Sequence, residues 1–338
     1  MTNQSSKEIW AFWKGIEGDS NVYVSTSGGS PPAANISAVA APLRGSINGV
    51  LQNYYLTSSK PAVVALPDRL LFACRDANSS NIYFCAVAGA TGQPGGRLNP
   101  RVVPNVGTAW APSLAASTVS PGDAIMAWNG VGSDTRIWLA KYNASQDTGA
   151  NSQPWSGQYL ANTGQGPLKS GSAPAIVSVA GALLMVWRGE GDNDNLYWSK
   201  SVDDGQNWVI GEINGHLTYQ QQIAGAGCSI APALTETFGT ALLAFKGGRD
   251  TNIYIASYTP GQAQPWSQIR GSVGPFGTSH GPSLATFDNQ TVLMTWKGVN
   301  DEGIYYTQVP IGNPFVTLTN QTVVGNQGTT IGPCVVAY

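Results

Sequence analysis

One phrase recurs six times along the chain, and this repetition constrains the fold more than any other feature. In its clearest copy, ALLMVWRGEGDNDNLY at 182–197, an apolar run ends in Trp187; a cation, a glycine, a polar loop and an aromatic follow. Five further copies occupy residues 9–23, 69–83, 124–138, 241–254 and 292–305. A spacing of roughly 50–60 residues is typical of propeller repeats.

Each repeat predicts four short strands. The first follows a proline, in segments that begin at Ala111, Ala173, Ala231 and Gly281. The second is the apolar run before the loop, and the third is the apolar–aromatic run after it. The fourth opens at an aromatic, in segments that begin at Pro154, Asn207, Pro265 and Pro314. Gly, Pro and Asn between these runs favour short antiparallel strands, and no segment shows sustained helical periodicity.

The two ends of the chain predict a closed ring. The N-terminal copy, IWAFWKG, begins at a second strand, whereas the C-terminal IGPCVVAY at 331–338 has the first-strand pattern. The last residues therefore complete the blade that the first residues begin, as a circular array requires. We predict an all-β fold: a six-bladed β-propeller of four-stranded antiparallel blades, forming one domain over 1–338.

Composition excludes several classes of function. A net charge of −2 in 338 residues argues against nucleic acid, which requires a basic face. No apolar run is long enough to span a membrane and no signal peptide is recognisable, so we expect a cytoplasmic protein, or one exported without such a signal. The four cysteines lack CxxC spacing and stand in or beside apolar runs. We expect them to be buried, with a disulfide as the alternative.

The loop between the second and third strands is the candidate site, because it opens on the face that carries the connections between blades. A cation and glycine begin most copies, and an aspartate stands four residues before the next aromatic. In the fourth copy the acid is shifted, to Asp192 or Asp194. Carboxylate and cation suit sugar hydroxyls, while an aromatic covers the apolar ring face. Repetition would give several weak, equivalent sites.

Structural explanations compete with binding at each position. The tryptophans suit packing between blades, the tyrosines suit the core, and each aspartate could only tie its own turn. The second copy, CRDANSSNIY, has Cys74 for tryptophan and Ser79 for aspartate, and the third has Asn129 for the cation. We therefore expect five sites rather than six, with the third weakened.

Other chemistry has less support. Ser201, Asp203, Gly205 and Trp208 match an Asp box, which folds a turn on the opposite face and also occurs in sialidases. A sialidase needs a central arginine cluster, and the arginines here are scattered. His216 and His280 are the only histidines, which excludes a repeated triad or a His-rich metal site. The DNDN run at 192–195 fits no EF-hand loop. We expect no metal and no cofactor, and His280 could contact ligand in one cleft.

With these motifs, the chain resembles the β-propeller lectins of fungi and some bacteria, most of all the fungal six-bladed type that recognises terminal N-acetylglucosamine. Fucose-binding propellers are the related alternative. The resemblance implies a non-enzymatic, multivalent lectin with sugar in clefts between blades. Its partners would be glycans and glycoproteins, without nucleic acid or membrane insertion, and the protein a monomer or small homo-oligomer. A sialidase-like glycosidase and a protein-interaction propeller are the alternatives. The implied sugar-binding residues are Trp13, Lys14, Asp19, Tyr23, Trp128, Asp134, Trp187, Arg188, Asp194, Tyr197, Lys246, Asp250, Tyr254, His280, Trp296, Lys297, Asp301 and Tyr305.

Overall fold

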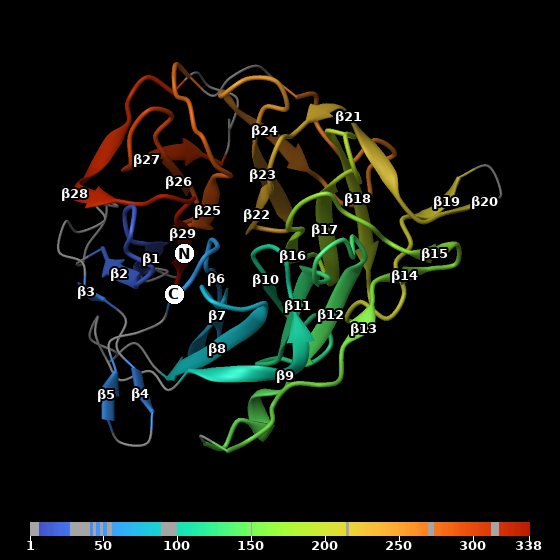
Figure 1. Ribbon diagram of the computed structural model, residues 1–338. Helices are drawn as coiled ribbons and strands as arrows, with labels where there is room; N and C mark the ends of the chain where they lie inside the picture. The colour runs from blue at the N-terminus through green and yellow to red at the C-terminus, as the bar shows by residue number, and fades with distance from the viewer. Residues whose placement is uncertain are drawn as a thin grey trace.

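Six antiparallel sheets are arranged as blades around a central axis (Figure 1), which confirms the predicted six-bladed β-propeller. The computed structural model describes residues 7–27, 41–42, 45–47, 50–52, 56–88, 100–149, 151–213, 216–269, 274–311 and 318–338. In these residues five blades have four strands, and the remaining one, blade 5, has three. No helix in the described part of the chain has the length and apolarity to cross a membrane.

The blades are numbered in chain order, and their strands are given from the axis outward. Blade 1 contains β29 (Cys334–Ala337), β1 (Ile9–Lys14), β2 (Val22–Thr26) and β3 (Ala41–Pro42). Blade 2 contains β6 (Ala62–Leu66), β7 (Arg69–Arg75), β8 (Asn81–Ala88) and β9 (Arg101–Gly107). Blade 3 contains β10 (Ser113–Ala116), β11 (Ala124–Asn129), β12 (Ile137–Tyr142) and β13 (Tyr159–Leu160).

The second half of the chain repeats the arrangement. Blade 4 contains β16 (Ala175–Val179), β17 (Ala182–Arg188), β18 (Asn195–Ser201) and β21 (Gln221–Gly227). Blade 5 contains β22 (Ala233–Thr237), β23 (Thr240–Lys246) and β24 (Ile253–Tyr258). Blade 6 contains β25 (Ser283–Thr286), β26 (Thr291–Lys297), β27 (Gly303–Pro310) and β28 (Thr322–Gly328). Outside the blades lie a 3₁₀ turn, η1 (Ala144–Gln146), and three hairpins: β4 (Gly45–Ile47) with β5 (Val50–Gln52), β14 (Asn162–Thr163) with β15 (Gly166–Pro167), and β19 (Gly211–Ile213) with β20 (His216–Thr218).

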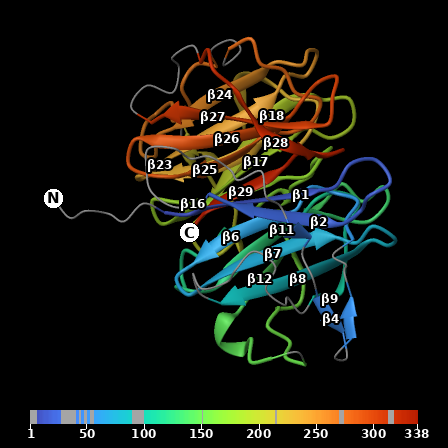
Figure 2. The same ribbon diagram turned by 90° about the vertical axis from the view of Figure 1, so that its left-hand side faces the viewer.

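The two ends of the chain close the ring, as predicted. β29 pairs antiparallel with β1, from Ile9 opposite Ala337 to Phe12 opposite Cys334 (Figure 2). Blade 1 is therefore built from both termini. Because each blade packs against two neighbours in a closed ring, completing blade 1 also supports the blades on either side of it.

The outermost strands differ in part from the prediction. In blade 4 the outer strand is β21, whereas the segment after Asn207 leaves the sheet and ends in the β19–β20 hairpin. Trp208 is buried in a core cluster shared with Leu139 of blade 3, Val209 N–H still donates to the Lys200 carbonyl of β18, and from Ile210 on the chain pairs with the hairpin instead. In blade 6 the outer strand is β28, and the predicted segment at Pro314 lies mostly outside the described residues.

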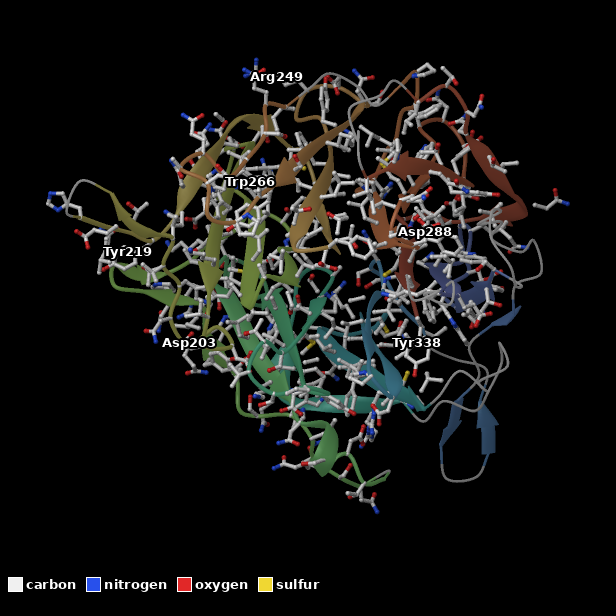
Figure 3. The ribbon with its side chains drawn as sticks, turned by 180° about the vertical axis from the view of Figure 1, so that it is seen from behind. Asp203, Tyr219, Arg249, Trp266, Asp288 and Tyr338 are labelled. Atoms are coloured by element: carbon white, nitrogen blue, oxygen red, sulfur yellow. The ribbon has the colours of Figure 1, made fainter. Side chains whose placement is uncertain are left out.

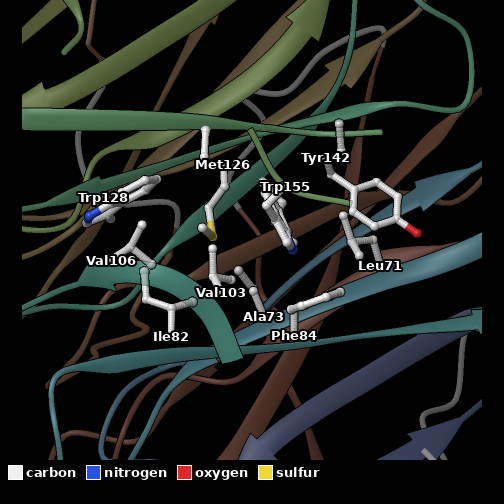
Figure 4. Packing of buried hydrophobic residues seen from close by; sticks show 14 of the residues in the cluster. Leu71, Ala73, Ile82, Phe84, Val103, Val106, Met126, Trp128, Tyr142 and Trp155 are labelled. Carbon is white, nitrogen blue, oxygen red and sulfur yellow. The ribbon is translucent and has the colours of Figure 1, made fainter. Parts of the chain in front are cut away.

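Each pair of neighbouring blades shares an apolar layer. Between blades 2 and 3, Trp128 and Met126 of β11 pack over Ile82, Phe84 and Val103 (Figure 4). All six residues of β11 are buried, because a blade's second strand is covered on both faces. This double cover explains why these strands read as continuous apolar runs instead of alternating ones. All four cysteines are buried, as predicted, and none of them forms a disulfide.

Hydrogen bonds join each blade to the next on one face of the ring. Six buried residues precede the innermost strands, and we call them the junction residues: Thr57, Thr108, Ser170, Cys228, Thr278 and Thr329. Each donates its backbone N–H, over 2.7–2.8 Å, to a carbonyl in the previous blade's loop between its second and third strands. This loop and the connections between blades therefore share a face, as predicted.

Candidate functional site

Three repeated lysines are anchored inside their own loops. Lys297 Nζ donates to Ser279 Oγ at 3.1 Å, to the Gly298 carbonyl at 3.2 Å and to the Asp301 carbonyl at 2.7 Å. Lys14 and Lys246 make the same three kinds of contact. An ammonium has three donors, and all are used here. This geometry gives the lysines a structural role in the turn, and their contact with a sugar stays a prediction.

The fourth and third copies replace lysine with other internal donors. Arg188 forms an ion pair with Asp194 at 2.7 Å, and its Nε also donates to the Cys228 carbonyl at 3.1 Å. Asn129 Nδ2 donates to the Ser170 carbonyl at 2.9 Å. Arg188 and Asp194 thus tie blade 4 to the junction residue of blade 5, and their role as sugar ligands likewise stays a prediction.

The repeated aspartates cap their own turns, which is the alternative that the sequence left open. Asp19 accepts the Asn21 backbone N–H at 2.9 Å and the Tyr23 hydroxyl at 2.7 Å. This hydrogen bond to Asp19, together with burial, raises the pKa of Tyr23 to about 12. Asp250 and Asp301 repeat the arrangement with Tyr254 and Tyr305.

The position after the cation has to be glycine for a steric reason. The aspartate folds back over it, so a Cβ on Gly298 would lie 2.1 Å from Asp301 Oδ1. A Cβ on Gly15 would meet Asp19 at 2.5 Å in the same way. The spacing between glycine and aspartate is therefore a packing rule of the turn, and it does not by itself indicate a ligand.

In blade 4 the capping position belongs to Asn193, which the sequence reasoning missed by taking Asp194. Asn193 Oδ1 accepts the Asn195 N–H at 3.1 Å, and its Nδ2 donates to the Tyr197 hydroxyl at 3.0 Å. Counting four residues back from Tyr197 would have identified it. In blade 3, Asp134 caps the turn and also accepts from Trp138 Nε1 at 3.0 Å.

The four predicted tryptophans belong to the core: Trp128 is 0% exposed and Trp13, Trp187 and Trp296 are 1% exposed. A sugar cannot lie on their ring faces, which corrects their predicted role as stacking platforms. The half-buried aromatics of the third strands are the accessible rings: Tyr23, Tyr83, Trp138, Tyr197, Tyr254 and Tyr305. Trp138 was missed, although its alignment with the tyrosines is visible in the sequence.

One of these rings lines a cleft beside blade 4. The cleft, of about 320 Å³, has one wall from Thr163 and residues 165–169 around the β14–β15 hairpin. The other walls come from the loop and strand that contain Glu190, Asn193 and Tyr197, and from Tyr219 and Gln220. Tyr197 stacks on Trp187 with ring centroids 6.4 Å apart, so only an edge of the indole reaches the cleft. Tyr219 lies at the outer edge of the ring (Figure 3).

The polar lining of this cleft is nearly neutral overall. Lys169 Nζ lies 3.5 Å from Glu190, whose carboxylate also accepts the Thr135 hydroxyl at 2.7 Å. The Thr135 hydrogen bond, followed by the charge of Lys169, lowers the pKa of Glu190. Gln165, Gln220 and Asn193 supply amides. The cleft thus offers the rings of Tyr197 and Tyr219, several amides and one ionised carboxylate.

The remaining predicted features lie away from this cleft. Arg75 of blade 2 donates to Ser58 and to the Thr108 carbonyl, while Ser79 Oγ bonds Asp76 at 2.6 Å. His280 contacts Ser279 Oγ through Nδ1 at 3.0 Å, and burial followed by the charges of Lys297 and Lys246 lowers its pKa. The Asp box folds as a turn at the opposite end of β18, where Ser201 Oγ bonds Asp203 at 2.6 Å.

Removing a loop lysine is expected to change stability and not ligand binding. We expect Lys297→Met to lower the free energy of unfolding by roughly 1–3 kcal/mol, because three acceptors lose a charged donor. Sugar affinity should be unchanged. Urea unfolding and sugar titration check both statements, with Lys200→Met as control, since the Lys200 ammonium makes no hydrogen bond among the described residues. A sugar-binding defect with wild-type stability would contradict this scaffold role.

The Asp134 turn is expected to make blade 3 sensitive to acid. The hydrogen bond from Arg136, outweighing burial, lowers the pKa of Asp134 to about 2. Because this lies below the usual value of about 3.9, its stabilisation is present above pH 4 and is lost as the pH falls toward 2. Between pH 6 and pH 2.5, wild type should lose more unfolding free energy than Asp134→Asn. Asp192→Asn, in an exposed loop, should behave as wild type; equal losses in all three proteins would refute the prediction.

Comparison with known proteins gives a fold-level match. No protein-family model and no curated protein matches the chain. Among solved structures, the chain is similar to the Aleuria aurantia lectin in complex with Fucα1-6GlcNAc, with a TM-score of 0.54 and 12% identity over 96% of each chain. It is also similar to AofleA from Arthrobotrys oligospora, with a TM-score of 0.56 and 9% identity over 98% of this chain and 93% of that one. The α-L-arabinofuranosidase Arb93A from Fusarium graminearum has a TM-score of 0.51 and 14% identity over 99% and 98%. At these identities the shared feature is the propeller.

Proposed function

We propose that this protein is a carbohydrate-binding lectin and that a terminal sugar occupies the cleft beside blade 4. The observation that carries the proposal is the lining of that cleft, in which half-buried Tyr197 stands among amide and carboxylate groups. Its volume falls at the lower end of the roughly 300–1,000 Å³ of small-molecule sites. A pyranose has one apolar face for the ring and several hydroxyls for the amides.

We also propose which sugars bind and that more than one blade binds them. N-acetylglucosamine is the favoured ligand and fucose the second, the latter supported by the fucosylated ligand of the Aleuria aurantia lectin. The other half-buried rings of the third strands occupy the position of Tyr197 in their blades. Sugar at several of these positions would make the protein multivalent, with avidity for clustered glycans on glycoproteins.

The carboxyl group that lines the cleft favours sugar binding over hydrolysis. Glycosidases generally use a pair of carboxyl groups, one with a raised pKa that acts as the acid. Among the described residues that line the cleft, Glu190 is the one carboxylate, and its pKa is lowered. A lowered pKa keeps the group ionised as a hydrogen-bond acceptor and removes the proton that a leaving group would need.

A glycan array combined with a turnover assay tests the function. We expect binding to glycans with terminal N-acetylglucosamine or fucose, inhibition by the free monosaccharide, and no release of product from aryl β-N-acetylglucosaminides, α-fucosides or α-arabinofuranosides. Product release that saturates with substrate would favour the hydrolase, as in the arabinofuranosidase with this fold. Failure to bind any glycan would overturn the proposal.

A further inference from the structure

The central channel of the ring contains an amine that the scaffold does not require. Immediately before the proline that leads into each innermost strand, five blades have a small residue: Ala111, Ala173, Ala231, Gly281 and Gly332. Blade 2 has Lys60 there, and its side chain lines a cavity of about 110 Å³ at this end of the channel. Since five equivalent positions do without a long side chain, Lys60 is not explained by the fold.

The side chains that line the cavity beside Lys60 are mostly apolar, and Lys60 itself is half-buried. Prolines from four blades line the same cavity, with Cys334 beside them. Lys60 Nζ reaches from blade 2 to the Pro282 carbonyl before blade 6, at 2.6 Å. None of the ion pairs among the described residues involves Lys60. Among the described residues, the Cys334 thiol on β29 is the titratable group that acts on Lys60, and His280 precedes Pro282 by two residues.

An ammonium without a carboxylate partner is disfavoured in such a cavity. Burial accordingly lowers the pKa of Lys60, and only a thiolate at Cys334 would act in the opposite direction. Burial raises the pKa of Cys334, so the thiol stays protonated near neutral pH and is a poor nucleophile. One N–H of Lys60 is held by Pro282, which positions the nitrogen and leaves the lone pair of the neutral amine available.

We propose that Lys60 is a reactive amine that condenses with short, uncharged aldehydes entering the channel. The nitrogen lone pair attacks the carbonyl carbon and forms a C–N bond, giving a carbinolamine. The carbonyl oxygen then leaves as water with the two amine hydrogens, and an imine remains, so that no oxidant or reductant is needed. The small cavity restricts the partner to a few carbons, and its proline lining favours an apolar chain.

Competitive labelling of the full chain tests this site. Propionaldehyde at limiting concentration near neutral pH, with cyanoborohydride to trap the imine, should label Lys60 several times faster than Lys169, whose side chain is 50% exposed. Pyridoxal, which is bulkier and more polar, should favour Lys169 over Lys60. Peptide mass mapping measures both rates, and the labelling of Lys60 should begin at lower pH.

The Lys60→Arg variant provides the control, because it keeps a long cation in the channel. It should unfold at the wild-type urea midpoint and lose only the fast-labelled peptide, with Lys169 labelled as before. Labelling of Lys60 that is equal to or slower than that of Lys169 across the pH range would overturn the proposal. Sugar binding does not enter this experiment, so its outcome is independent of the proposed function.

Discussion

Replacing Tyr197 by alanine should weaken sugar binding at blade 4 by at least tenfold. Tyr197 is a half-buried ring of the cleft, held by Trp187 behind it and by Asn193 at its hydroxyl. A loss of about 1.4 kcal/mol corresponds to tenfold in Kd, a modest value for an aromatic anchor at the centre of a site. Trp187 borders the cleft, so its indole N–H signal in an NMR titration reports this site alone even if other blades also bind.

Two further variants make the result specific. Tyr197→Phe keeps the ring and loses the hydroxyl, so it should retain most of the affinity. Val202→Ala, at an exposed residue beyond the opposite end of β18, should leave the titration unchanged. Trp187→Phe identifies the indole signal among the 11 tryptophans of the chain. If Tyr197→Ala binds as wild type, the cleft is not the sugar site.

Deleting residues 334–338 should destabilise the whole ring. The deletion removes β29, exposes Ile9, Ala11 and Phe12 of β1, and opens the innermost ladder of blade 1. Loss of the buried Val335 side chain alone corresponds to about 1.5–3 kcal/mol, and the lost pairing adds to this. We expect a fall of more than about 3 kcal/mol in unfolding free energy, measured by urea denaturation.

A synthetic peptide of residues 331–338 serves as the control for this deletion. Added in excess, it should raise the urea midpoint of the truncated protein, because it can pair with β1 in the native register. A peptide of the same composition in scrambled order should have no effect. A truncated protein that unfolds at the wild-type midpoint would show that the closure of blade 1 does not stabilise the ring.

The fold was predictable because the sequence pattern of a blade occurs six times. Six apolar runs at regular spacing define the buried second strands, and the pattern of Cys334–Ala337 identifies the missing first strand of blade 1. The outer strand of blade 4 was not predictable from the repeat. Trp208, in the segment that leaves the sheet, packs against blade 3, and no local pattern carries that tertiary contact.

The candidate site was predictable only in part, for a related reason. Repetition identifies residues that every blade needs, and the structure uses Lys297, Gly298 and Asp301 for the turn itself. The cleft beside blade 4 depends instead on what is not repeated, such as Tyr219 and the β14–β15 hairpin. These residues are far from Tyr197 in the sequence, and it is the packing of the blades in the ring that brings them close to it.

A crystal structure of the wild-type protein with bound N-acetylglucosamine or fucose tests the location of the sugar site most directly. We predict the sugar in the cleft beside blade 4, with its apolar face on Tyr197 and its hydroxyls within hydrogen-bonding distance of Asn193 and Glu190. The assignment of the sugar site would be wrong if the sugar lay in the central channel. It would also be wrong if Lys297 or Arg188 left its internal partners to contact the sugar.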